Sequence, residues 1–382
     1  IEEIAALGAQ CAAGEQELRR SRIRLAVFGT AQNHRRILLI AARLGHVTGD
    51  MTVVERKLGA VLEGERLRIA RRQSRRIDPA LAGRTDRRGV LAGASDPVVV
   101  TVPFGTGPTF DEAVAALGSQ ASFVRVPADA SSSRQAGERV ADSLRYGTTV
   151  IVEGGHNSSP DCGVGFLEGL LGVPGLDPRQ PEALADALAR AQSLVADAGV
   201  DLVCAASTAR PLLGLDSVLA VAPDLEPIEA QDTALTAALT QVFAHRPLGR
   251  RQLLDGADVH PARQRGSGAG GGVGAVIAAI GGRIAPTGDL LSSLLGLEAI
   301  IDGSDLVLVA EPELASPVLA ESTLDCVTRV AAAHALPVVA ITHRSSLSHF
   351  EKAEWGLHGV FETEGSVTLE DAGRRVARTW LR

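Results

Sequence analysis

The feature that most constrains the fold is a series of continuous apolar runs from residue 96 onward. Glycines or prolines bound these runs, and stretches with helical spacing separate them. Val, Ile and Leu follow one another without polar alternation, which indicates strands buried on both faces and hence a mainly parallel sheet with helices on each side. The runs are PVVVTV (97–102), TTVIVEGG (148–155), DLVCAAS (201–207), SVLAVAP (217–223), DLVLVAE (305–311), LPVVAIT (336–342) and GVFE (359–362).

Composition and cysteine spacing agree with an α/β protein whose cysteines are in the reduced thiol form. Hydrophobic residues make up 45% of the chain and aromatic residues only 3%, so small aliphatic side chains must build the core. The cysteines lie far apart and form no C-x-x-C pair, which argues against a zinc site or a disulfide framework. We find neither an apolar run long enough to span a membrane nor a signal-peptide layout, and we expect a cytoplasmic protein.

Residues 1–95 differ from the rest of the chain in charge. This segment carries a net charge of +8 and the remainder −15, and arginine supplies almost all of the positive charge. No aromatic residue accompanies the arginines of residues 66–89, so a nucleic-acid partner is not expected. The pattern leaves three interpretations open for 1–95: an Arg-rich extension with no defined order, a helical appendage, and a nucleic-acid-binding arm. The chain begins at Ile1 rather than Met, which is compatible with a fragment.

A parallel sheet also predicts where a ligand binds. In such sheets ligands lie beyond the carboxyl ends of the strands, close to the point where the strand order reverses. This rule selects the loops at residues 103–109, 154–165, 207–214, 311–318 and 342–348.

Residues 266–274, GSGAGGGVG, begin an apolar stretch and contain the dinucleotide pattern G-x-G-x-x-G. The polar, proline-containing segment DVHPARQR precedes them, and it cannot be the buried strand that this pattern requires. Asp289 stands at a predicted helix start rather than at a strand end. Two interpretations remain: a phosphate cradle made of backbone amides, and a flexible loop or close helix crossing.

Taken in order, these blocks resemble the glycerate kinase family over residues 97–382. The segment GSGAGGGVGAVIAAIGG is similar to the family's Gly-Ala-Gly-Gly-Gly loop and the helix behind it. Asp161, Gly163 and Gly165 fall on the family's Asp-Gly-Gly-x-Gly pattern. AASTARPLLG and GSDLVLVAEPELASPVL occupy the places of two further blocks, and Glu311 matches the glutamate of Glu-Gly-Arg-x-Asp.

The resemblance implies a doubly wound, mainly parallel Rossmann-like sheet with a second α/β domain, plus the Arg-rich extension at 1–95. We expect residues 96–165 and 298–382 to form the Rossmann-like domain and residues 166–297 to form the second domain with the glycine-rich loop. It also implies transfer of a phosphoryl group from ATP to glycerate or a related small hydroxy acid, with Mg²⁺. The oligomeric state stays open.

The resemblance also assigns roles to residues. It implies Asp161 and Glu311 as catalytic residues that share Mg²⁺, because hard oxygen ligands suit that ion. Structural roles are the alternative: Asp161 as a helix cap, Glu311 as a strand end, and the histidines and Arg344 as solvated surface residues. The expected substrate-binding residues are His156, Arg210, His343 and Arg344, and the expected ATP-binding residues are Gly268, Ala269, Gly270, Gly271 and Gly272.

Several family positions are replaced in this chain. Phe104 to Gly107 supply no carboxylate, Thr208 replaces an aspartate, and Pro312, Glu313 and Ala315 replace the glycine, arginine and aspartate after Glu311. A lysine position is taken by Ser322. Losses of this kind remove transition-state stabilisation. The alternative function is therefore a catalytically inactive relative that serves as a nucleotide-binding or regulatory module.

Overall fold

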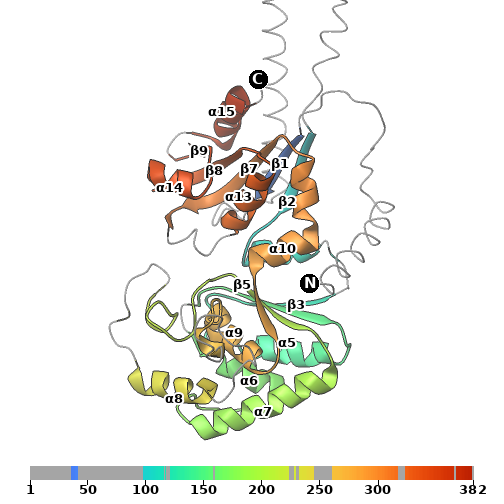
Figure 1. The fold of residues 1–382 in the computed structure, drawn as a ribbon, viewed down its shortest axis with the longest axis vertical. Coiled ribbons are helices and arrows are strands. Elements are labelled where there is room, and N and C mark those ends of the chain that lie inside the picture. The colour runs from blue at the N-terminus through green and yellow to red at the C-terminus, as the bar shows by residue number, and fades with distance from the viewer. Residues whose placement is uncertain are drawn as a thin grey trace, which may run out of the picture. The chain divides into compact units, whose positions relative to one another are not determined.

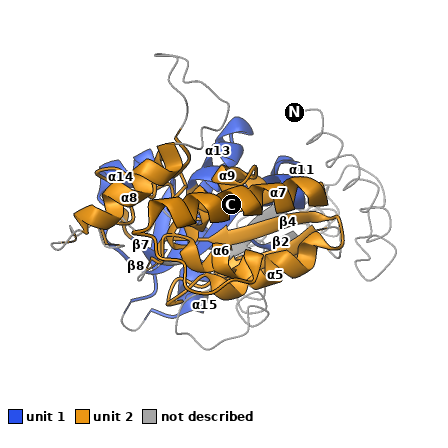
Figure 2. Ribbon diagram, turned by 90° about the horizontal axis from the view of Figure 1, so that it is seen from below, with its two compact units in different colours: residues 1–103, 291–314, 325–382 blue, residues 104–290, 315–324 orange. Residues whose placement is uncertain are grey.

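The computed structural model describes residues 36–41, 98–115, 117, 121–157, 160–222, 228, 232–244, 260–316, 323–364 and 367–380. The chain divides into two compact units, coloured separately in Figure 2. Unit 1 comprises residues 1–103, 291–314 and 325–382, and unit 2 comprises residues 104–290 and 315–324. Ser322, the replaced lysine position, lies outside the described residues.

Unit 1 contains a five-stranded sheet with the order β2-β1-β7-β8-β9, and every neighbouring pair is parallel. The interior position of β1, between β2 and β7, is unexpected, because its sequence RILLIA lies within the Arg-rich segment that we treated as an extension. The strands are β1 (Arg36–Ala41), β2 (Val98–Pro103), β7 (Leu306–Leu314), β8 (Val338–Ser345) and β9 (Gly359–Glu362).

The helices of the C-terminal part are α11 (Leu297–Asp302), α13 (Leu324–Ala333), α14 (His349–Glu354) and α15 (Leu369–Trp380). Helix α15 is strongly amphipathic, and its buried face consists of Ala372, Val376 and Ala377. These side chains form a core cluster with Leu308 and Val339 of the sheet, among other residues. Burial of this face explains why a helix with three arginines on its other side is held against the sheet.

Unit 2 contains a four-stranded parallel sheet with the order β3-β4-β5-β6. Figure 1 shows α5, α6, α7 and α9 together on one side of this sheet. The strands are β3 (Ala121–Val126), β4 (Thr149–Gly154), β5 (Leu202–Ala206) and β6 (Arg283–Pro286). The helices are α4 (Pro108–Ala115), α5 (Arg134–Leu144), α6 (Val164–Leu171), α7 (Pro181–Ala198), α8 (Thr233–Ala244), the 3₁₀ helix η2 (Pro261–Arg263) and α9 (Ala269–Ala279). Helix α10 (Thr287–Leu295) begins in unit 2, and its residues from Leu291 onward belong to unit 1.

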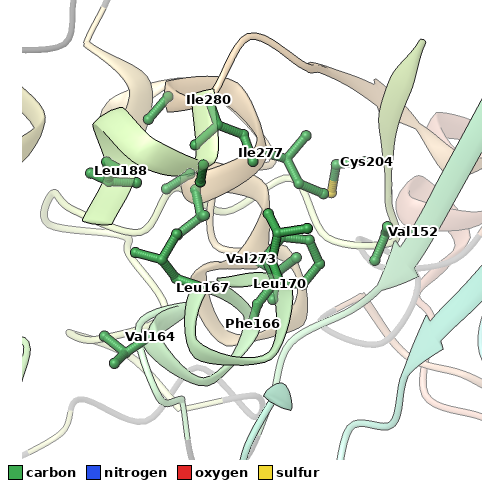
Figure 3. Close-up of a cluster of buried hydrophobic side chains, with 14 of the residues drawn as sticks. Val152, Val164, Phe166, Leu167, Leu170, Leu188, Cys204, Val273, Ile277 and Ile280 are labelled. Atoms are coloured by element: carbon green, nitrogen blue, oxygen red, sulfur yellow. The ribbon is translucent and has the colours of Figure 1, made fainter. Parts of the chain in front are cut away.

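The core of unit 2 is aliphatic, as the composition predicts. In Figure 3, Val273 and Ile277 of α9 lie among Val152 and Cys204 of the sheet and Phe166 and other side chains of α6. Helix α9 is buried along its whole length, so its apolar sequence is that of a core helix rather than a surface helix. In the described residues, no helix has both the length and the apolar character needed to cross a membrane.

The predicted α/β architecture with parallel sheets and flanking helices is confirmed. The division of the chain differs from the expected one in the placement of residues 104–165. These residues belong to unit 2 because β3 and β4 pair with β5, and not with the sheet of residues 298–382.

The predicted strand at 217–223 is wrong for residues 217–220, and Val221 forms only a single β-bridge. Ser217 is a bend and residues 218–220 form a turn, because the Val218 amide donates to the Pro211 carbonyl and the Ala220 amide donates back to Ser217. The apolar run is therefore buried as a turn, with Val218 only 1% exposed.

Candidate functional site

The glycine loop, residues 266–274, adopts a backbone that only glycine accepts easily. Gly270, Gly271 and Gly272 have φ values of 61°, 68° and 112°, all in the left-handed region. In the described residues directly before it, 260–265, the chain forms the 3₁₀ helix η2 and no strand, so the buried strand that dinucleotide binding requires does not lead into the glycines.

The loop is buried against neighbouring main chain. A Cβ atom on Gly272 would lie 2.6 Å from the carbonyl carbon of Cys162, and one on Gly268 would lie 2.8 Å from the Pro211 carbonyl oxygen. Similarly, a Cβ atom on Gly154 at the end of β4 would lie 2.7 Å from Cα of Gly270. The glycines thus permit close contact between main-chain segments.

Most of the loop amides donate to carbonyls inside unit 2. The Gly268 amide donates to Arg210 at 3.0 Å, and the Gly270 amide donates to Gly155 at 2.9 Å. The amides of Ala269 and Gly272 donate within the loop, to Gly266 at 3.1 Å and to Gly268 at 3.2 Å. These bonds support the close-packing interpretation, and ATP binding by Gly268, Ala269, Gly270, Gly271 and Gly272 stays a prediction.

Asp161 connects the starts of two helices. Its Oδ2 accepts from the Ser133 amide at 2.6 Å, and its Oδ1 accepts from the Gly163 amide at 3.0 Å. Ser133 and Gly163 are the N-cap residues of α5 and α6. The Ser133 hydroxyl also donates to Asp161 and accepts from the Phe166 amide at 2.7 Å. A carboxylate in this position satisfies amides that a helix start leaves unpaired.

These contacts bear on the predicted Mg²⁺ site. Both oxygens of Asp161 already accept hydrogen bonds, and within the described part of the chain no group of three or more His, Cys, Asp or Glu side chains is arranged to hold a metal ion. Glu311 belongs to unit 1, whereas Asp161 belongs to unit 2. These hydrogen bonds support the helix-capping interpretation of Asp161, and a magnesium ion shared by Asp161 and Glu311 stays a prediction.

Glu311 lies inside β7, opposite Thr342 of β8. The side chain is buried, and none of the other described residues forms a hydrogen bond or ion pair with it. Desolvation is the cause that raises its pKa from 4.5 to about 8. A buried carboxyl group with a pKa near neutrality suits proton transfer.

His343 and Arg344 follow Thr342 on β8 and are exposed. Arg344 pairs with Glu313 across the two strands, with Nη2 and Oε1 2.7 Å apart, and this pairing raises the pKa of the guanidinium. The arginine expected to bind substrate thus has an acidic neighbour at one of the replaced family positions.

His156 and Arg210 contact each other in unit 2. Nη1 of Arg210 lies 3.3 Å from Nδ1 of His156 and also donates to the Ala222 carbonyl at 2.9 Å. His156 is only 6% exposed, so it is not the solvated surface histidine that we considered as the alternative to substrate binding. The structure brings these two predicted residues together, but it gives Arg210 carbonyl partners that limit its freedom to turn toward a ligand.

Glu153, which the sequence patterns did not single out, is the most buried carboxylate among the described residues of unit 2. It is 2% exposed on β4, and burial raises its pKa, opposed by hydrogen bonds from Ser207 and the Gly107 amide. The run TTVIVEGG could have identified Glu153, because an acidic residue near the end of a continuous apolar strand is expected to be buried together with hydrogen-bond partners.

Comparisons with known proteins were consistent with this architecture. The sequence model of the glycerate kinase family matches residues 109–382. Among solved structures, the crystal structure of a protein described as "putative glycerate kinase 2 from Salmonella typhimurium LT2" is similar, with 17% sequence identity and a TM-score of 0.56. The match covers 90% of this chain and 98% of that chain, and at this identity it concerns the fold alone. No curated protein matches the chain.

Proposed function

This chain belongs to the glycerate kinase family, and on that premise we propose that it transfers the γ-phosphoryl group of ATP to glycerate or a related small hydroxy acid. The observation that carries the proposal is the buried carboxyl of Glu311 on β7. With a pKa of about 8 the group is mostly protonated at neutral pH and about half ionised at mildly alkaline pH, where it can accept a proton. A base with a pKa near the working pH is efficient in proton transfer.

The proposed step balances without any further reactant. The substrate hydroxyl gives its proton to the Glu311 carboxylate while its oxygen bonds to the γ-phosphorus of ATP. The bond between that phosphorus and the β,γ-bridging oxygen breaks, and ADP leaves. The products are the phosphorylated hydroxy acid, ADP and a proton that Glu311 later releases to water.

Arg344 is the proposed partner of the substrate carboxylate. It lies on the same face of the sheet as Glu311, two residues after Thr342, whereas His343 points to the opposite face. Arg344 keeps further guanidinium donors beyond the one bonded to Glu313. A guanidinium binds a planar carboxylate well because it offers parallel N–H groups.

ATP and Mg²⁺ are what the family implies for the donor side. Mg²⁺ would neutralise charge on the phosphate oxygens when it is bound. Because the described residues provide no complete ligand set, the proposed proton step is assigned to Glu311 alone.

A coupled assay of ADP release with D-glycerate, ATP and Mg²⁺ tests the proposal. We expect turnover by the wild-type chain and a loss on the order of 10²–10⁴ in kcat for Glu311→Gln, which cannot accept the proton. Glu298→Gln is the matched control, since this carboxylate on α11 is 81% exposed and has no proposed role. Absence of wild-type turnover, or equal rates for Glu311→Gln and the control, contradicts the proposal.

A second function is a nucleotide-binding or regulatory module without turnover. The hydrogen bonds that occupy both oxygens of Asp161 favour it, as do Thr208 and the residues after Glu311 that replace family positions. This function predicts no ADP release, together with a melting temperature that ATP still raises. If ATP has no effect on melting either, both functions are wrong.

A further inference from the structure

Glu153 is the centre of a buried hydrogen-bond network in unit 2. Its Oε1 accepts from the Gly107 amide at 3.1 Å and from the Ser207 hydroxyl. Oγ of Ser207 lies 2.8 Å from Oγ1 of Thr287, so that hydroxyl group continues the network. Ser207 and Thr287 are 6% and 2% exposed, which removes all three side chains from competition with water.

The network joins segments that are distant in the sequence. Gly107 lies in the loop that follows β2, Ser207 directly follows β5, and Thr287 begins α10 directly after β6. Ser207 and Thr287 follow the carboxyl ends of β5 and β6, the edge of the unit 2 sheet where ligands of α/β proteins bind. One carboxyl group therefore joins this edge to the loop that carries Gly107, within unit 2.

The loop of residues 104–107 contacts Glu153 through its last residue, Gly107. The side chain of Phe104 at its start is fully buried, as is that of Phe110 in α4. Between them Gly107 has a φ of +58°, and its carbonyl accepts from the Phe110 amide at 3.0 Å as α4 begins. The two phenylalanines fix the ends, whereas the direction of the Gly107 peptide group is set by the hydrogen bond to Glu153.

The direction of that main chain matters because the loop carries no charged side chain. Its residues are Phe104, Gly105, Thr106 and Gly107. Whatever this loop offers to an anionic substrate comes from backbone amides and the Thr106 hydroxyl, and such donors act only when their geometry is preorganised.

We propose that Glu153 is a positioning residue: it holds residues 104–107, through Gly107, in the shape that binds the anionic substrate of the proposed phosphoryl transfer. This inference rests on the proposed function for its catalytic part. The hold on the loop itself is independent of turnover.

The test compares Glu153→Gln and Glu153→Met with a matched control, Glu168→Met. Gln keeps an acceptor oxygen at the Oε1 position, whereas Met is of similar length and accepts neither hydrogen bond. Glu168 on α6 is also a carboxylate that accepts a backbone amide in unit 2, from Leu176 at 2.8 Å, and it has no proposed role in binding.

Hydrogen exchange at residues 104–107, thermal unfolding, and kcat and KM in the ADP-release assay are measured for each variant. We expect Glu153→Met to expose the Gly107 amide and to raise the KM for the hydroxy acid by on the order of 10-fold to 100-fold. Glu153→Gln is expected to keep the wild-type protection of the Gly107 amide and the wild-type KM. Glu168→Met is expected to lower the melting temperature without changing KM or exchange at 104–107. Equal KM values for Glu153→Met and Glu168→Met overturn the positioning role.

A variant that fails to fold leaves the proposal testable. If Glu153→Met does not fold, Glu153→Asp is the second variant, because its shorter side chain draws the acceptor oxygen away from Gly107. It is expected to speed exchange of the Gly107 amide; unchanged exchange overturns the hold on the loop. If the wild-type chain shows no turnover, the phosphoryl transfer and the catalytic part of this inference fail together, while the exchange data still decide whether Glu153 holds residues 104–107.

Discussion

The Ser133 amide donates a 2.6 Å hydrogen bond to the carboxylate of Asp161, and this contact joins the start of α5 to the loop before α6. The two helices then approach so closely that a Cβ atom on Gly137 would lie 2.0 Å from the Phe166 carbonyl oxygen. Asp161 therefore stabilises a helix pair whose small residues leave no room for adjustment.

Replacement of Asp161 by Asn should destabilise unit 2. The variant loses one acceptor oxygen and leaves an amide at a helix start without its partner, at a cost of about 1–3 kcal/mol in the free energy of unfolding. Asp201→Asn is the control, because Asp201 forms an exposed pair with Arg283 and should cost less than about 1 kcal/mol. Urea unfolding followed by circular dichroism measures both. Equal stability of the two variants would show that the Ser133 contact is not important.

Gly272→Ala should be far more damaging than Gly281→Ala. Both residues have positive φ, 112° and 99°, so both substitutions impose backbone strain of about 1–2 kcal/mol. Only at Gly272 does the added Cβ also meet the Cys162 main chain, at 2.6 Å, whereas at Gly281 nothing lies within 4 Å. We expect Gly272→Ala to lose about 3 kcal/mol or more, or to fail to fold. Similar melting temperatures for the two variants would mean that the loop is not packed as described.

Stability should decrease as the pH rises because of Glu311. Burial raises the pKa of this carboxyl from 4.5 to about 8 in the folded protein, so the folded state retains a proton that the unfolded chain has released. The stabilising contribution is fully present below pH 4.5 and is lost as the pH rises to about 8. Glu311→Gln cannot ionise, and it should match the wild type in acid and exceed it in stability at mildly alkaline pH, by roughly 1.4 kcal/mol for each pH unit through which the pKa is raised. Thermal unfolding between about pH 4.5 and about pH 8.5 measures this, and parallel curves for the two proteins would contradict the buried carboxyl.

Arg344→Ala should weaken binding of the hydroxy acid. If the guanidinium binds the substrate carboxylate, its loss removes a charge-assisted hydrogen bond, and we expect the KM to rise by about 10-fold or more. Arg374→Ala on α15 serves as the control, because Arg374 pairs with Asp371 on the same helix and has no proposed role in substrate binding. Initial rates at varied D-glycerate give KM for both variants. An unchanged KM for Arg344→Ala would assign this arginine to its pair with Glu313 alone.

Local patterns predicted much of the fold because they report on one strand or helix at a time. The run DLVLVAE led to β7, and the spacing of PEALADALARAQSLVADAG led to α7, which begins at Pro181 and ends at the left-handed Gly199. Such patterns failed where neighbours in space decide. RILLIA pairs with β2 and β7 although it lies among arginines, and SVLAVAP is buried as a turn.

The amino-acid sequence by itself determined the parallel α/β architecture, the family and the positions where glycine is required, because apolar runs and glycine spacing act over a few residues. Tertiary structure alone decided what those residues do. The amide of Gly270 donates to Gly155, the oxygens of Asp161 accept from Ser133, and Glu153 binds Gly107 and Ser207. Each of these contacts joins residues that are far apart along the chain, and the choice between a ligand-binding group and a structural one depends on which partners the folded chain places within hydrogen-bond distance.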